Sequence, residues 1–275
     1  IHENADAAKG TIGGSKVGRT GKSNLTEQPE IIDLLQVLME NGLQKEKKEV
    51  ESLVSYLDNM QEQFGQVLLE LQEVKGQLQQ MQESKVKLSV RQYVNQAEGK
   101  CLEVGKQFDR VRKNFLQSSQ NAVEVFREKG KDALRKVVSA MKIPNTFMLM
   151  EKVLHGAAED MTYRVAQMAA LNKELHVAGS HTKNIGRILT GKEVKAVGEQ
   201  IPEQGLIYKI SKSFLAMSGR LSSMEQTAIG IKKRLEQFTQ KEEQKPSVKG
   251  ELKKLKEEKK IQPQLSDPVK EQGRE

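Results

Sequence analysis

Residues 50–81 read VESLVSYLDNMQEQFGQVLLELQEVKGQLQQM, and their apolar side chains follow a regular repeat. Spacings of three and four residues alternate, which is the a and d pattern of consecutive heptads. The members of this first seam are Val50, Leu53, Leu57, Met60, Phe64, Val67, Leu71, Val74, Leu78 and Met81. A repeat kept over this length predicts a long helix that makes coiled-coil contacts.

A second seam with the same spacing lies in residues 207–238, where Ala228 fills one further position. Its other members are Ile207, Ile210, Phe214, Met217, Leu221, Met224, Ile231, Leu235 and Phe238. An apolar stripe is unstable against water, so each seam is expected to meet another helix. That helix can belong to the same chain or to a partner, and the pattern leaves both open.

The composition supports an all-α fold. Only 36% of the 275 residues are hydrophobic and 4% are aromatic, so large side chains that fill globular cores are scarce. Six prolines leave room for long uninterrupted helices. We therefore expect elongated amphipathic helices with coiled-coil segments, flanked by disordered tails.

Breaks in the pattern divide the chain into five segments. The Gly-rich start and the charged end have too little apolar surface to offset the entropy of ordering, which predicts disorder. The segments are a disordered tail at 1–28, an acidic helix and coiled coil at 29–84, a basic long helix at 85–143, two amphipathic helices with an irregular connection at 144–240, and a charged disordered tail at 241–275.

Capping signals predict where the first helices begin and end. Asn41-Gly42 is a C-cap candidate, because both residues accept a left-handed backbone. Ser89 with Gln92 resembles a capping box at the start of the second long helix. Pro144 is expected to end that helix.

The third helix is expected from 146 to 178, with Gly179-Ser180 as its cap. The stretch 181–202 has a mixed composition and is predicted to connect this helix to the next one. One short helix is expected inside it, at 185–189.

Charge separates the first two long segments. Residues 30–84 carry 4 basic and 11 acidic side chains, whereas residues 85–142 carry 14 basic and 6 acidic ones. This asymmetry leads to the hypothesis that the acidic helix folds back on the basic one through a turn near 84–89. Such a hairpin would bring Lys75 close to the region of Val104.

The basic segment offers a candidate anion-binding surface. Its cations are Arg110, Arg112, Lys113, Arg127, Lys129, Lys131, Arg135 and Lys136. Clustered cations suit the phosphates of nucleic acid or of an anionic membrane. Aromatic stacking platforms are lacking, because Phe108 and Phe115 belong to an apolar stripe. A solvated face that neutralises the acidic helix is the favoured interpretation.

No constellation of residues indicates an enzyme. Residues 14–23, GSKVGRTGKS, end like a P-loop, but Lys16 stands where the motif needs its first glycine. The four histidines, which are His2, His155, His176 and His181, lack the spacing of metal ligands. We therefore predict no catalytic residues, no cofactor, no metal site and no small-molecule substrate.

The single cysteine, Cys101, falls on an apolar stripe and is expected to be a small buried hydrophobe. One cysteine per chain excludes an intramolecular disulfide, which fits a reducing compartment. No apolar run is long enough to span a bilayer, and a signal-peptide pattern is missing. These features favour a cytoplasmic protein.

Three stretches carry a resemblance to a known family. They are ENGLQKEKKEVESLVSYLDNMQEQFGQVLLELQEVKGQL at 40–78, GSHTKNIGRILTGKEV at 179–194 and KPSVKGELKKLKE at 245–257. The chain resembles an uncharacterised, coiled-coil-rich helical family of Gram-positive gut bacteria, often encoded in mobile or conjugative elements. The resemblance implies no catalytic residues, and the stretch 179–194 is its most distinctive part.

The sequence thus favours a non-enzymatic coiled-coil protein that self-associates or scaffolds a helical protein partner. The first alternative is a nucleic-acid-binding accessory protein that uses the basic segment 100–136. The second is peripheral attachment to an anionic membrane surface. Strand orientation, oligomeric state and the partner's identity stay open.

Overall fold

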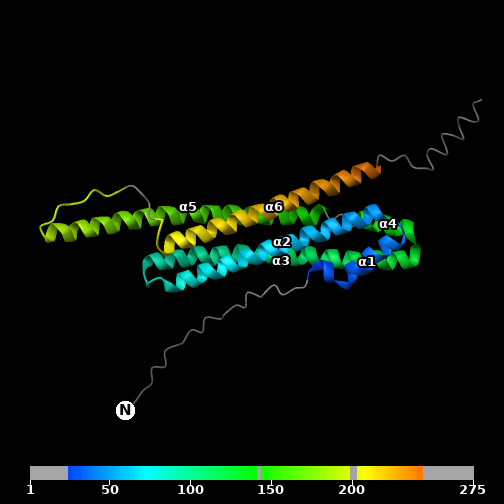
Figure 1. Cartoon of the computed structure of the whole chain (residues 1–275), viewed down its shortest axis with the longest axis horizontal. Coiled ribbons are helices and arrows are strands. Elements are labelled where there is room, and N and C mark those ends of the chain that lie inside the picture. Colours follow the sequence, from blue (N-terminus) through cyan, green and yellow to red (C-terminus); the bar gives the residue numbers. More distant parts are fainter. Residues whose placement is uncertain (1–23, 141–143, 199–202, 244–275) are drawn as a thin grey trace, which may run out of the picture. The chain divides into compact units, whose positions relative to one another are not determined.

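The computed structural model describes residues 24–140, 144–198 and 203–243. Every regular element in these ranges is a helix, so the predicted all-α class is confirmed (Figure 1). The elements are the 3₁₀ helix η1 (Leu25–Glu27) and the α-helices α1 (Pro29–Glu40), α2 (Gln44–Gln80), α3 (Lys85–Lys129), α4 (Lys131–Ala140), α5 (Pro144–Leu189) and α6 (Leu206–Glu243).

The chain divides into two units, Ile1–Lys232 and Lys233–Glu275, with the boundary inside α6. The first unit contains η1, α1 to α5 and most of α6, and its helices are described below. Within the second unit the described residues, 233–243, continue the helix of α6.

Helices α2 and α3 form the antiparallel hairpin that the charge pattern predicts. Lys75 of α2 forms an ion pair with Glu98 of α3. Further along the hairpin, Arg112 donates a hydrogen bond to Gln61. Residue numbers rise on one helix as they fall on the other, which defines the antiparallel pairing, and the hairpin hypothesis is confirmed.

The turn of the hairpin lies slightly earlier than predicted. Ser84 is the N-cap of α3, and its hydroxyl accepts a hydrogen bond of 3.2 Å from the backbone N–H of Lys87. The ammonium of Lys87 donates to the carbonyl of Met81 at 2.7 Å and also pairs with the carboxylate of Glu83. The hydrogen bond from Lys87 to Glu83 lowers the pKa of Glu83. The predicted capping box at Ser89 is wrong, because this residue lies inside α3.

The first seam is mostly buried inside the chain. Eight of its ten residues are buried, whereas Leu53 is half-buried and Met81 lies just past the end of α2. Val54 is buried beside Leu53, because α2 packs against α1 and α3 together and so needs a wider apolar face than a two-helix coil. Helix α3 is central and contacts α1, α2, α4 and α5.

Two predicted helix boundaries are wrong, and both involve glycine. The basic helix does not continue to residue 143, because Gly130 with φ of 76° separates α3 from α4. Conversely, α5 runs unbroken through Gly179 and Ser180, where a cap was expected. The C-cap predicted at Asn41-Gly42 is confirmed, with Gly42 at φ of 66°.

The predicted disorder of 1–28 is wrong for residues 24–28, and residues 1–23 lie outside the described part. The backbone N–H of Leu25 donates to Asp58 of α2 at 2.7 Å, and the Leu25 side chain is buried. At the other end, residues 241–243 belong to α6, and residues 244–275 lie outside the described part.

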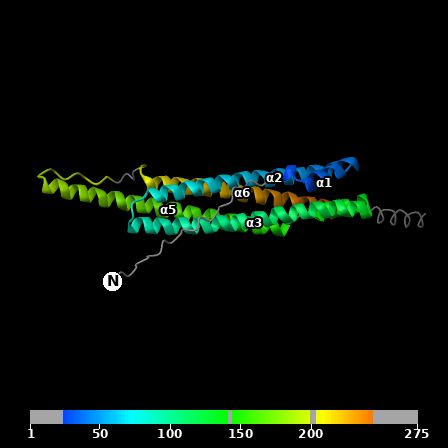
Figure 2. The same cartoon turned by 90° about the horizontal axis from the view of Figure 1, so that it is seen from below.

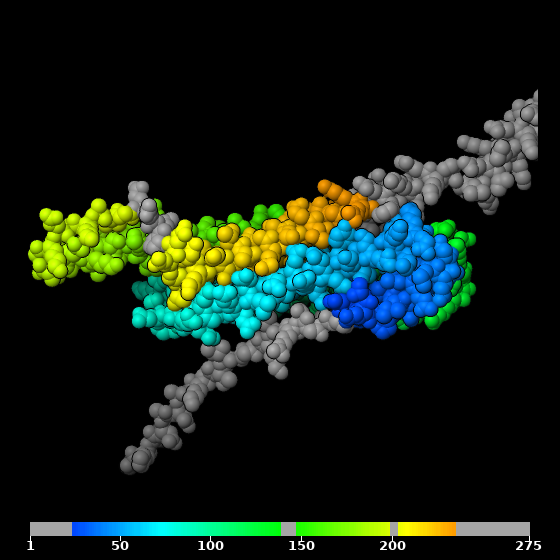
Figure 3. Space-filling model, in the orientation of Figure 1, coloured from blue at the N-terminus to red at the C-terminus, as the bar shows by residue number. Residues whose placement is uncertain are grey.

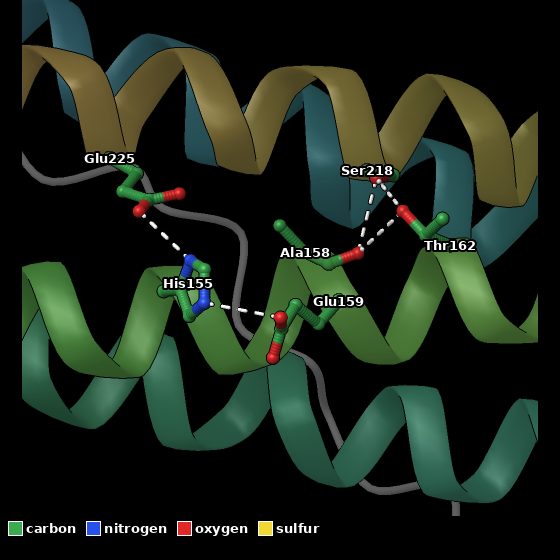
Figure 4. A network of polar contacts seen from close by, with 6 residues as sticks. All are labelled: His155, Ala158, Glu159, Thr162, Ser218 and Glu225. Carbon is green, nitrogen blue, oxygen red and sulfur yellow. Dashed lines mark hydrogen bonds and ion pairs between the residues drawn. The ribbon is translucent and has the colours of Figure 1, made fainter.

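Helices α5 and α6 pair antiparallel, and a network of polar contacts joins them (Figure 4). The Nδ1 atom of His155 lies 3.0 Å from the Oε1 atom of Glu225, and the Ser218 hydroxyl donates to the carbonyl of Ala158 at 3.1 Å. Thr162 and Ser218 share a further hydrogen bond of 2.8 Å. All members of the second seam from 207 to 231 are buried, whereas the side chains of its last two members lie outside the described part.

Candidate interaction site: the projecting end of helix α5

Helix α5 extends past the helices that cover it. Ala158 pairs with Ser218, and α6 begins at Leu206, so by antiparallel register α6 reaches α5 only near residue 170. On the α3 side, Arg164 lies 5.3 Å from the ring centroid of Tyr93, and α3 begins at Lys85. By the same antiparallel register, the first residue of α3 lies beside about residue 172 of α5. The last 15 residues of α5 therefore project for roughly 22 Å at 1.5 Å per residue.

Figures 1 and 2 show this projection from two directions, with the end of α5 standing beyond the other helices of the first unit. Figure 3 shows the same end clear of other described residues on that face. We call residues 175–198 the arm, and we call residues 29–174 with 206–232 the bundle. The arm consists of the end of α5 and the segment that follows it.

The segment after α5 is fixed to one side of the helix by hydrogen bonds. Gly191 has φ of 70° and lets the chain reverse, with the N–H of Lys192 donating to the carbonyl of Arg187 at 2.8 Å. The side-chain amide of Asn184 donates to the carbonyl of Lys195 at 2.7 Å and accepts from its N–H at 3.1 Å. The guanidinium of Arg187 donates to the carbonyl of Glu193 at 2.8 Å.

The arm also exposes large apolar side chains to solvent. The exposed fractions are 58% for Ile185, 61% for Ile188 and 81% for Leu189. Leu175 and, on the segment after α5, Val194 are also exposed. At 100° per residue, Ile185 and Leu189 lie roughly 100° and 140° around the helix from Asn184, whereas Ile188 lies roughly 40° from it. Asn184 is the one buried residue of the arm.

The arm is basic as well as apolar. It contains the cations Lys183, Arg187, Lys192 and Lys195, against one acidic residue, Glu193. Two of the cations, Arg187 and Lys192, lie two and three residues from Leu189 along the helix and its cap. The arm therefore combines exposed aliphatic side chains with a net positive charge.

The basic segment predicted to bind anions is not one continuous patch. Arg112 is buried against Gln61, and Arg135 pairs with Glu46 of α2 at 3.0 Å. Arg110 and Lys113 are exposed near the middle of α3. The remaining exposed cations lie about 22 Å further along α3 and on α4; they are Arg127, Lys129, Lys131 and Lys136.

Chemistry elsewhere in the described residues is sparse. A polar hollow on α3 is lined by four side-chain amides, the hydroxyl of Ser118 and one carboxylate, Glu124. Burial raises the pKa of the Cys101 thiol to about 12, so the reactive thiolate is suppressed. Across the described ranges, no cluster of three or more His, Cys, Asp or Glu could hold a metal ion. The GSKVGRTGKS stretch and His2 lie outside those ranges.

Sequence reasoning missed the arm as a site. It placed the helix end at Gly179 and treated residues 181–202 as a connection. The available signal was the absence of proline between 145 and 201, which permits a helix through the glycines. That signal was outweighed by the expectation that Gly-Ser caps a helix.

Fold and site together define an all-α protein that carries a projecting basic-apolar arm. Within the described part of the chain, no helix is long and apolar enough to cross a membrane. A model of the DUF6674 family, a family of unknown function, matches residues 27–275. The chain therefore belongs to the DUF6674 family. Neither the curated proteins nor the solved structures include a significant match to it.

Proposed function

We propose that the chain is a non-enzymatic scaffold in which the bundle holds the arm out to contact a partner. One observation carries the proposal: the arm projects beyond the bundle and exposes Ile185, Ile188 and Leu189. Large aliphatic side chains gathered at one place in contact with water commonly mark an interaction site. The hydrogen bonds of Asn184 and Arg187 support it further, because they give the arm a defined surface.

The two seams contribute to the stability of the folded chain, and their burial argues against pairing between chains. Leu57, Met60 and Val67 are at most 1% exposed, because helices of the same chain cover them. Pairing of the first seam between chains would require the α2–α3 hairpin to open and these contacts to be lost. The proposed partner contact is therefore placed on the arm, and the purified chain is expected to have a mass near 30.9 kDa.

The proposal of a non-enzymatic role rests on the residues that the fold brings together. The hollow on α3 gathers four amide side chains and the Ser118 hydroxyl around Glu124, and its lining holds no histidine, cysteine, lysine or arginine. The nucleic-acid alternative has weaker support, since burial of Arg112 and the ion pair of Arg135 remove two of its eight cations. Origin in a mobile element of Gram-positive gut bacteria stays a prediction.

Site-specific labelling of an introduced cysteine tests the scaffold proposal. Ile188→Cys places a thiol on the arm, and Leu69→Cys places one on α2, where the native leucine is 58% exposed. Buried Cys101 contributes little background. Maleimide labelling rates are compared between the purified chain and a total extract, membranes included, of cells that naturally express it.

We expect slower labelling of Ile188→Cys in the extract and an unchanged rate for Leu69→Cys. A partner that covers the arm would produce this difference, whatever its chemical class. Equal rates at both positions in extract and in buffer would contradict the proposal.

A further inference from the structure

We propose that the partner of the arm is an anionic lipid bilayer, whose surface the tip of α5 enters. This inference rests on the proposed function and names the class of partner. The tip consists of the last turns of α5 and the cap that follows, residues 183–195. Three kinds of observation support it: the apolar side chains, the cations around them, and the hydrogen bonding of the backbone.

The apolar side chains are concentrated at the tip of α5, which is the part of the arm that would contact a bilayer surface first. Leu189 is the last residue of α5, it is 81% exposed, and Ile185 and Ile188 lie within one turn of it. Exposed leucines and isoleucines of the bundle, such as Leu69 and Leu102, are instead scattered over different helices. The arm holds its aliphatic group roughly 20 Å from the bundle, by the rise of the helix. A planar surface can therefore reach it without meeting the bundle.

The cations around the tip match the charge of an anionic surface. Lys183 precedes the apolar group by less than one turn, and Lys192 follows Leu189 by three residues. Lysine stems lie along apolar surface while their ammonium groups reach headgroup phosphates. Cations placed beside exposed aliphatic residues are the arrangement by which helices bind at the interface of anionic membranes.

The backbone at the tip is already satisfied by hydrogen bonds within the chain. The Thr190 hydroxyl donates to the carbonyl of Gly186 at 3.0 Å, and the N–H of Gly191 donates to that of Ile188 at 3.1 Å. The Lys192 N–H donates to the carbonyl of Arg187 at 2.8 Å. The end of a helix normally leaves such carbonyls to water. Their internal partners lower the penalty of moving this end into an apolar layer.

A second copy of the chain is a less favourable occupant. Each arm carries four cations and one anion, so two arms placed side by side would repel each other. A bilayer with anionic headgroups supplies the opposite charge together with an apolar layer. An acidic protein groove supplies similar chemistry and is separated by the experiment below.

The test is flotation of the full-length chain with vesicles at low ionic strength. One set is phosphatidylcholine alone and the other contains about 30% phosphatidylglycerol. We expect binding to the anionic vesicles, at least about tenfold weaker binding to neutral ones, and a decrease with added salt. No binding to the anionic vesicles would overturn the inference.

Matched variants assign the binding to the tip. Ile188→Asp with Leu189→Asp is expected to lower binding by at least about tenfold, whereas Leu69→Asp is expected to leave it unchanged. Lys183→Glu with Lys192→Glu is compared with Arg110→Glu with Lys113→Glu, which changes the net charge equally on α3. Equal loss in both members of either comparison would overturn the inference, and circular dichroism checks that all variants remain folded.

Two further outcomes separate this inference from the proposed function. Protection of Ile188→Cys in an extract from which membranes have been removed, without vesicle binding, would refute the lipid partner and leave the scaffold in place. A dimeric mass by light scattering that the Ile188→Asp with Leu189→Asp variant abolishes would identify a second copy as the occupant and overturn the lipid assignment.

Discussion

The two ends of helix α5 have similar apolar side chains but very different surroundings. In the bundle, Met150, Leu154 and Met161 are fully buried, since other helices of the first unit lie over them. In the arm, Ile188 and Leu189 belong to the same helix and are more than half exposed. Large aliphatic residues occur at both ends of this helix, so their burial is decided by where the neighbouring helices end.

This contrast separates the residues that stabilise the fold from those available to a partner. A buried aliphatic side chain contributes through area removed from water and through packing contacts. An exposed one contributes little to folding and can be replaced at small cost. The following predictions test the contrast, from the largest expected effect to the smallest.

Thiol reactivity should differ most between bundle and arm. Burial raises the pKa of Cys101 from its ordinary value of 9.0 to about 12, whereas a solvent-exposed cysteine at position 188 would keep the ordinary value. Because the thiolate is the reacting species, we expect Ile188→Cys to react with maleimide at pH 7.5 at least about a thousandfold faster than Cys101. Labelling kinetics of the variant, followed by mass spectrometry of peptides, measure both sites together. Comparable rates would mean that the bundle opens around Cys101.

The raised pKa of Cys101 also predicts how stability depends on pH. Above its ordinary value of 9.0, the unfolded thiol loses its proton while the folded thiol keeps it until about pH 12. The protonated Cys101 thiol therefore makes its full contribution to the free energy of unfolding below pH 9. This contribution is lost as the pH rises toward 12, by at most about 1.4 kcal/mol per pH unit. Cys101→Ala should show a shallower decline than the native chain in urea unfolding between pH 9 and 10.5.

Truncation of leucine should be costly in the bundle and nearly neutral in the arm. Leu57→Ala removes a side chain that is 1% exposed, and we expect the free energy of unfolding to fall by about 2–5 kcal/mol. Leu189→Ala is expected to change it by less than about 0.5 kcal/mol. Urea unfolding followed by circular dichroism compares the two, and a large loss with Leu189→Ala would show that the arm is part of the core.

Two glycines of α3 test the closeness of the α2–α3 contact. A Cβ atom at Gly105 would lie 3.3 Å from the ring of Phe64, whereas nothing lies within 4 Å of one at Gly99. Replacing glycine by alanine inside a helix stabilises it by about 0.5–1 kcal/mol where space is free. Gly99→Ala should show this gain in thermal unfolding and Gly105→Ala should not. The same gain at both positions would indicate a looser hairpin.

The smallest effect is expected for Asn184, whose hydrogen bonds hold the segment after α5. Asn184→Ala should speed amide exchange at Lys195 by roughly tenfold, since each lost hydrogen bond contributes about 1 kcal/mol. Asn184→Asp keeps the acceptor for the Lys195 N–H and should give a smaller change. The urea midpoint of the bundle should stay constant in both variants. A shifted midpoint would mean that the stability of the bundle depends on the hydrogen bonds of the arm.

The seams were predictable because heptad spacing is a local property of the sequence. Residues from Leu57 to Leu78 alternate at three and four, and all of these seam residues are buried. Charge asymmetry was sufficient to predict the hairpin, because opposite charges favour contact between consecutive segments. The failures at Gly130 and Gly179 have one cause: a helical glycine differs from a breaking one through its backbone angle, which residue identity does not specify.

The sequence by itself determined the all-α class, the apolar faces of α2 and α6 and the tendency of the first two segments to pair. These depend on periodicity and charge within a few turns of helix. Only the tertiary structure decided that the first seam is covered within the chain, that Arg112 is buried and that α5 extends past the ends of the neighbouring helices. The reason is that burial and exposure depend on the relative lengths and register of helices far apart in sequence, which no local pattern encodes.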